Sequence, residues 1–146
     1  MEGTKRQLLW HGMALFFLGL ITGLVEQKFT NVRMGLAAHL EGVMNGTFLL
    51  ALGAIWNEVS LIPRIKAVAY WAVLVGTYGN WAVTTLAAIL GTAALSPISA
   101  AGRSAPAWQE TLVTTGFVAI GSAIIAASVL VLWGLRGSAA AKPLPR

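Results

Sequence analysis

The chain has 146 residues, of which 57% are hydrophobic and 10% charged, with a mean hydropathy of +0.75. These values differ from those of soluble domains and predict an integral membrane protein. The absence of cysteine excludes disulfides, thiolate metal sites, iron–sulfur clusters and covalently attached c-type haem. The net charge of +5 is better explained by membrane orientation and anionic lipid head groups than by nucleic acid, because the basic residues cap the apolar stretches. We expect no nucleic-acid partner.

Four apolar stretches are each long enough to cross a bilayer as a helix. They cover about residues 8–25, 35–56, 67–95 and 111–135. The sequence therefore predicts an all-α fold, an integral membrane four-helix bundle that forms a single domain over residues 1–136. Residues 137–146, rich in Ala and Pro, are expected to form a disordered cytoplasmic tail.

Basic residues are unevenly divided between the two ends of these spans. With four spans, the N-terminus, the connector 57–66 and the C-terminal tail share one side of the membrane. That side carries Lys5, Arg6, Arg64, Lys66, Arg136, Lys142 and Arg146. The other side carries only Lys28, Arg33 and Arg103. The positive-inside rule then places both termini in the cytoplasm, in a bacterial-type inner (plasma) membrane.

The first span contains a histidine and a pair of glycines. Gly19 and Gly23 have the G-x-x-x-G spacing that lets two membrane helices approach closely, and helix packing is their main interpretation. His11 lies one turn in from the predicted cytoplasmic face, where we expect it to make a structural hydrogen bond.

The second span is the most informative, because it holds His39, Glu41 and Asn45 at membrane depth. An ionisable side chain there costs about 2.5–3.5 kcal/mol on insertion scales, so a partner or a function is expected. At about 100° per residue, Glu41 and Asn45 fall together on one face and His39 on nearly the opposite one. The stripe of His39 also contains Gly35, Gly42 and Gly46. These glycines predict a trough that is flat enough for a planar group or another backbone.

The third span repeats the pattern of polar groups at depth. Asn80 should lie near mid-membrane, where its amide needs hydrogen-bond partners. A structural bond across helices and a role in a pocket are both open. Asn80 shares its face with Gly76, Thr77 and Thr84, and Tyr78 adds an aromatic ring with a polar tip.

The connector 96–110 is predicted to be a loop rather than a helix, because it contains Pro97, Gly102 and Pro106. A connector of this length could cover the mouth of a site.

The order of these residues resembles the hydroxylaminobenzene mutases. The resemblance rests on the run HLEGVMNG at residues 39–46, His11-Gly12 in the first span and Gly79-Asn80-Trp81 in the third. Members of that family are small four-span enzymes that convert an aryl hydroxylamine into an aminophenol. A more distant resemblance, through the spacing from His39 to Asn45 and through Asn80, is to styrene oxide isomerase. The similarity covers about the first 95 residues and depends on order and spacing across three helices.

The resemblance implies a cofactor and a set of site residues. The isomerase branch holds non-covalent haem b between the subunits of a trimer. Carried over, this makes His39 the axial ligand of the iron and Asn45 a group that orients the substrate. The glycines assigned to the haem are Gly35, Gly42 and Gly46. Where the isomerase has an acidic residue and a tyrosine, this chain has Gly76 and Thr84, which favours the hydroxylamine branch over isomerisation of an aryl epoxide to an aldehyde.

The implied reaction is an intramolecular hydroxyl transfer on a small aromatic substrate that partitions into lipid. A ferric haem with an open coordination position can act on the substrate as a Lewis acid. Glu41 could carry a proton to the departing oxygen, and Asn45 could hold that oxygen. The substrate pocket is assigned Tyr78, Asn80 and Thr84. Because His39 and Asn45 point apart on one helix, we expect a ring-shaped homo-oligomer, a trimer by the resemblance, whose neighbouring subunits share each site.

Two interpretations from other classes remain open. A proton-coupled small multidrug-type exporter could use Glu41 as its buried carboxylate. However, exporters of this size place that carboxylate in the first helix, and the first helix of this chain has none at depth. A helix-packing or assembly protein would use the polar groups only for bonds between helices. The Soret band of the purified protein would separate the haem enzyme from both.

Overall fold

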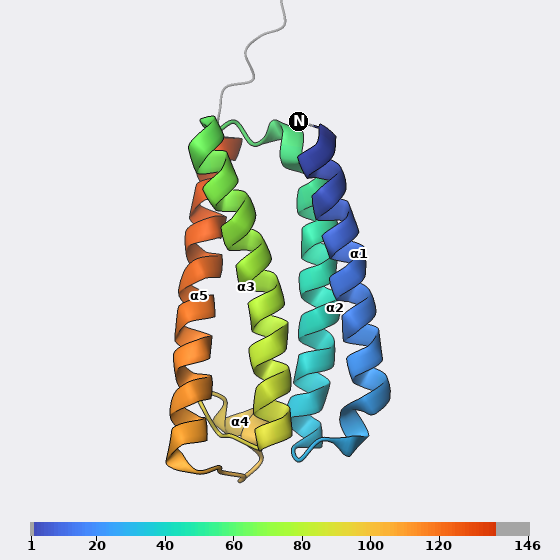
Figure 1. Ribbon diagram of the computed structural model, residues 1–146, viewed down its shortest axis with the longest axis vertical. Coiled ribbons are helices and arrows are strands. Elements are labelled where there is room, and N and C mark those ends of the chain that lie inside the picture. Colours follow the sequence, from blue (N-terminus) through green and yellow to red (C-terminus); the bar gives the residue numbers. More distant parts are fainter. Residues whose placement is uncertain (1, 137–146) are drawn as a thin grey trace, which may run out of the picture.

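The computed structural model describes residues 2–136, which form four long helices and three short helical segments (Figure 1). The long helices are α1 (Glu2–Val25), α2 (Val32–Ile55), α3 (Pro63–Leu90) and α5 (Ala107–Leu135). The short segments are η1 (Glu26–Lys28), η2 (Trp56–Glu58) and α4 (Pro97–Ala100). All four long helices are long and apolar enough to cross a membrane, so the predicted all-α, four-span fold is confirmed. The predicted tail, 137–146, lies outside the described residues.

The helices begin and end at residues other than those predicted from hydropathy. The third span was predicted over 67–95, but α3 begins at Pro63 and ends at Leu90. Proline suits the first position of a helix, since the N–H that it lacks would have no partner there. Gly91 ends α3 because its φ of 71° is the left-handed conformation that closes many helices. Hydropathy located the membrane-spanning part of the helix, whereas these two residues set its ends.

The prediction of a loop over 96–110 was wrong at both ends of that range. Pro97–Ala100 forms one helical turn, and Glu110 lies inside α5. Proline starts a helix more readily than it continues one, and it stands at the first position of α4. Pro106 directly precedes α5 as its N-terminal cap residue.

The linker between α3 and α5 is held by side chains from two helices. The carboxylate of Glu110 accepts backbone N–H groups of Ala93, Ala94 and Ala105, at 2.9, 2.8 and 2.9 Å. Asn31, which caps the N-terminus of α2, donates its Nδ2 to the carbonyl of Ser99 at 2.9 Å. A linker held from α2 and α5 in this way fixes the end of the bundle opposite the start of α1.

Helices α1 and α2 lie side by side and pack closely through glycines (Figure 1). A Cβ added to Gly19 would lie 2.5 Å from the backbone nitrogen of Val43. On α2, Gly42 faces the α1 backbone at Gly19, and Gly46 faces it at Phe16. Small residues allow this approach, and dispersion contacts between the two backbones then stabilise the pair. The predicted role of these glycines in helix packing is confirmed.

The start of α1, segment η2, the start of α3 and the end of α5 gather at one end of the bundle (Figure 1). The backbone N–H of Ser60 donates to the carbonyl of Gly134 at 2.9 Å and ties the connector between α2 and α3 to α5. The start of α1 and the end of α5 lie at the same end of the bundle, as an even number of spans requires. The cytoplasmic location of this end stays a prediction from the charge pattern.

Candidate functional site

A polar cluster lies between α2 and α3 and consists of Glu41, Asn45 and Asn80. Asn45 Nδ2 donates to Glu41 Oε2 at 3.3 Å, and Asn80 Nδ2 donates to the same oxygen. All three side chains are half-buried. The structure therefore brings together the predicted catalytic residues of the second span and the amide of the third. When Glu41 is ionised, the hydrogen bonds from Asn45 and Asn80 are charge-assisted. Together they orient the carboxylate.

The cluster occupies the middle of the bundle. One apolar cluster lies towards the start of α1 and includes Leu8, Leu49, Trp56 and Tyr70. A second lies towards the linker end and includes Met34, Ala87, Ala88 and Val113. Along α2 and α3, Glu41 and Asn80 fall between these two groups. A carboxyl group at this depth has few alternative partners, so its two amide donors decide its position.

Two other residues assigned to the substrate pocket have different surroundings. The hydroxyl of Tyr78 donates to the carbonyl of His11 at 3.1 Å and lies 3.2 Å from His11 Nδ1. Tyr78 therefore faces α1, and residues two apart on a helix point about 200° apart, so it lies away from Asn80. Thr84 is buried, and its hydroxyl donates to the carbonyl of Asn80 at 2.9 Å. The structural hydrogen bond expected for His11 is confirmed.

His39 lies on the other side of α2, against α1. Its Nδ1 lies 2.8 Å from the carbonyl oxygen of Gly19. A carbonyl only accepts hydrogen bonds, so Nδ1 carries the proton and Nε2 of the neutral imidazole keeps a free lone pair. This is the arrangement of a metal-binding histidine, whose other nitrogen is fixed by a backbone carbonyl.

The imidazole borders an open hollow of about 530 Å³ between the ends of α1 and α2. Its walls are Leu20, Gly23, Leu24, Glu26, Leu36 and His39. The glycine that makes room for the ring is Gly23, since a Cβ there would lie 2.7 Å from His39 Nδ1. None of these residues comes from the linker 91–106, so the linker does not cover this hollow.

The glycine stripe of α2 is filled by the protein itself. Gly42 and Gly46 pack on the backbone of α1, and a Cβ on Gly35 would lie 3.0 Å from side-chain atoms of Glu26 and Phe29. Of the two occupants expected for the trough, a planar group or another backbone, the structure places a backbone there. The open space lies beside the stripe, next to His39.

Sequence reasoning missed Gly23 and Glu26 as neighbours of His39. Glu26 lines the same hollow, and its Oε2 is buried with no hydrogen-bond partner among the described residues. The polar atoms that it and His39 offer are acceptors, which suits a ligand that brings a cation or hydrogen-bond donors. The signal for Glu26 was present, because an acidic residue directly follows the first span.

Two half-sites therefore stand on different faces of α2. His39 turns towards α1 and its hollow, whereas Glu41 turns towards Asn80 on α3. The divergence follows from helix geometry, because positions 39 and 41 are about 200° apart around the axis.

Comparison with known proteins identifies the class. The model of the styrene oxide isomerase family matches residues 4–136, so the chain belongs to that family and is an isomerase. Hydroxylaminobenzene mutase HabB of Ectopseudomonas oleovorans is 42% identical over 136 residues, covering 92% of this chain and 83% of the relative. Hydroxylaminobenzene mutase HabA of the same organism is 37% identical over 125 residues, covering 85% of this chain and 93% of the relative. No solved structure gives a significant match.

Proposed function

We propose that the chain rearranges an aryl hydroxylamine to an aminophenol within the membrane. The observation that carries this proposal is the cluster of Glu41, Asn45 and Asn80, which sets one carboxyl group and two amides in the middle of the helix bundle. The two relatives named hydroxylaminobenzene mutase support the substrate class. A substrate with an apolar ring and a polar N–O group matches an apolar bundle with one polar layer.

The cluster can supply both hydrogen-bonding and acid–base chemistry. In the arrangement present, the Oδ1 atoms of Asn45 and Asn80 accept no hydrogen bond from residues 2–136, so they can receive the N–H or O–H of a substrate. Glu41, once protonated, gives its proton to the hydroxyl oxygen as the N–O bond breaks. The departing oxygen, now a water molecule, then adds to a ring carbon and returns one proton to Glu41. That carbon loses its own hydrogen as a proton, the nitrogen gains one, and the ring becomes aromatic again. Atoms and electrons balance, because the product is an isomer of the substrate.

We infer that His39 holds non-covalent haem b. The fit rests on its free Nε2 and on the three leucines of the hollow, which suit a flat apolar macrocycle. No group of three or more His, Cys, Asp or Glu side chains able to hold a metal ion is found among the residues that the structure describes. Haem fits a lone histidine, because the macrocycle brings the other ligands of its iron with it. When bound, the haem would supply a Lewis-acidic iron.

We propose that the site is completed between subunits of a cyclic oligomer, a trimer by the family resemblance. Support comes from the two faces of α2, since one subunit turns His39 and Glu41 in different directions. A heterologous interface brings one face of each subunit against the other face of its neighbour and so joins the two half-sites. The bilayer around such a ring excludes bulk water from the reacting group.

The family name makes isomerisation of an aryl epoxide the second candidate. By the family resemblance, Gly76 stands where the isomerase branch carries an acidic residue. A Cβ there would lie 2.9 Å from Cδ1 and 3.2 Å from Cα of Ile124, so α5 leaves no room for a carboxylate. This packing favours the hydroxylamine over the epoxide. Membership of an isomerase family also favours catalysis over the exporter and the assembly protein.

An anaerobic assay of the purified protein tests the proposal. Hydroxylaminobenzene should give an aminophenol without NAD(P)H or oxygen, because the rearrangement moves no net electrons. Styrene oxide, offered in parallel, should turn over more slowly. Strict dependence on a reductant would contradict the mutase reaction. Faster turnover of the epoxide would indicate that the epoxide, and not the hydroxylamine, is the substrate.

A further inference from the structure

Three neighbouring hollows lie at the end of the bundle where α1 and α3 start and α5 ends. Ser60 borders one hollow with Arg136 and another with Lys66. Asn57 borders the Lys66 hollow and also a smaller one with Lys5 and Arg6. The first two have volumes of about 510 and 410 Å³. The hollows are therefore neighbours at one end of the bundle, and none of them is lined by His39 or Glu41.

The charged side chains that line these hollows all have one sign. Its lining includes the cations Lys5, Arg6, Lys66 and Arg136. No acidic side chain is among the lining residues that the structure describes. Cations that line one surface without carboxylate partners favour an anionic ligand there.

Lys66 is held in place rather than free in solvent. Its Nζ donates to the carbonyl of Val59 at 2.6 Å and lies 5.5 Å from the ring centre of Trp56. An ammonium group has three donors, so two remain for a ligand in the hollow. The ring of Trp56 is buried and forms part of the same wall. A fixed cation loses little side-chain entropy on binding, which favours a defined site.

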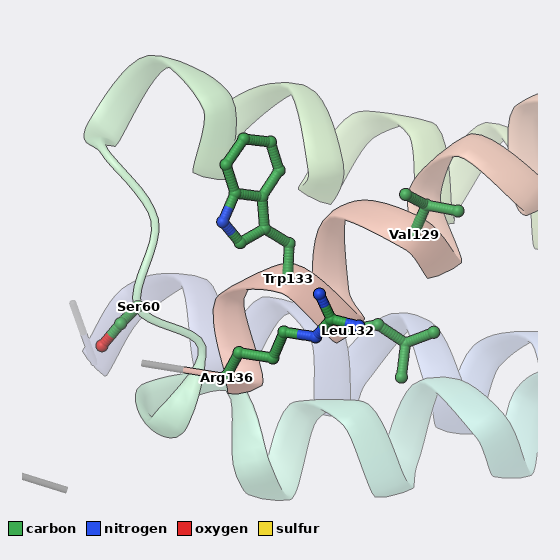
Figure 2. A pocket seen from close by; sticks show the side chains of 5 residues that line it. All are labelled: Ser60, Val129, Leu132, Trp133 and Arg136. Carbon is green, nitrogen blue, oxygen red and sulfur yellow. The ribbon is translucent and has the colours of Figure 1, made fainter. Parts of the chain in front are cut away.

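The Arg136 hollow continues along the apolar surface of α5. Val129, Leu132, Trp133 and Arg136 are spaced so that they share one side of the helix. Figure 2 shows the Arg136 side chain running back along α5 towards Leu132. Val129 and Leu132 are 55% and 62% exposed, so an acyl chain can lie against them. Tryptophan and arginine at the end of a span match the head-group level of a bilayer.

From this combination we propose that the surface is a binding site for an anionic phospholipid. The phosphate is held by Arg136, Lys66 adds positive charge from the neighbouring hollow, and an acyl chain lies along Val129 and Leu132. Free phosphate would use the cations but not the apolar groove, and a soluble partner would not reach below the head groups. The site goes beyond the proposed function, because it shares no residue with the two half-sites. It also agrees with the predicted cytoplasmic side, whose leaflet is anionic.

Native mass spectrometry of the delipidated full-length protein in detergent tests the proposal. Phosphatidylglycerol and phosphatidylcholine with identical chains are titrated separately. We expect preferential binding of phosphatidylglycerol, weakened about fivefold by Arg136→Gln and further by Arg136→Gln with Lys66→Gln. Arg103→Gln, which removes an exposed cation at the opposite end, is the matched control and should bind as the wild type does.

Three outcomes would overturn the proposal. They are equal binding of the two lipids, wild-type binding by Arg136→Gln or equal weakening by Arg103→Gln, and full displacement of phosphatidylglycerol by millimolar inorganic phosphate, which would indicate a simple ion site. Lys66→Gln also removes the bond to Val59 and can affect folding. Arg136→Gln alone therefore remains decisive, since the Arg136 side chain is exposed and circular dichroism can verify the helices of the variant.

Discussion

Gly23→Ala is predicted to disturb the His39 half-site while leaving the fold intact. A Cβ at this position would lie 2.7 Å from His39 Nδ1 and 3.1 Å from both neighbouring ring carbons. Ordinary contact begins at 3.4 Å, so Nδ1 must move by at least 0.7 Å. The atoms in the way belong to a side chain rather than to a backbone, so the ring can move without separating α1 from α2.

The displacement acts on the hydrogen bond that orients the imidazole. Nδ1 lies 2.8 Å from the carbonyl of Gly19, and a shift of 0.7 Å directly away from that oxygen would end the bond. The net loss of one hydrogen bond is about 0.5–1.5 kcal/mol. If the bond orients Nε2 for iron, haem affinity should fall by the corresponding factor, about two- to tenfold.

Haem titration followed by the Soret band, together with a thermal melt of each variant, measures both effects. His39→Ala should abolish the Soret band, and it therefore gives the signal of a protein without bound haem. Gly121→Ala is the matched control, because a Cβ there meets nothing within 4 Å. Wild-type haem affinity in Gly23→Ala would refute the reasoning about the oriented imidazole. A wild type that binds no haem on reconstitution would refute the cofactor itself.

Three further predictions address the second half-site, the oligomer and the linker. Glu41→Gln should lower kcat by roughly 10²–10⁴ with haem retained, the usual range for loss of a general acid, and steady-state kinetics showing wild-type activity would remove the proton role. Co-expression of inactive His39→Ala and Asn45→Ala chains should restore part of the activity, because some interfaces pair two intact faces; mixed oligomers that stay inactive would place all groups in one subunit. Glu110→Ala should lower the free energy of unfolding, since it leaves backbone N–H groups of the linker without their acceptor, and an unchanged denaturation midpoint would contradict this.

The sequence by itself determined the four spans and the two faces of α2. Backbone groups inside a bilayer must bond within their own segment, so an apolar run of sufficient length has little alternative to a helix. Helix periodicity then separates His39 from Glu41 whatever surrounds them. The helix ends were less predictable, because Pro63 and Gly91 act through local backbone geometry that hydropathy does not register.

Only the tertiary structure decided which neighbour each face meets. Periodicity places Gly42 on a stripe, but it does not say that the backbone of α1 fills that stripe and leaves the hollow beside Gly23. In the same way, the sequence alone identifies Asn80 and Tyr78 only as two polar residues of one helix. Helix packing sends Asn80 to Glu41 and Tyr78 to His11, because contacts between distant segments depend on how whole helices dock, which no local pattern encodes.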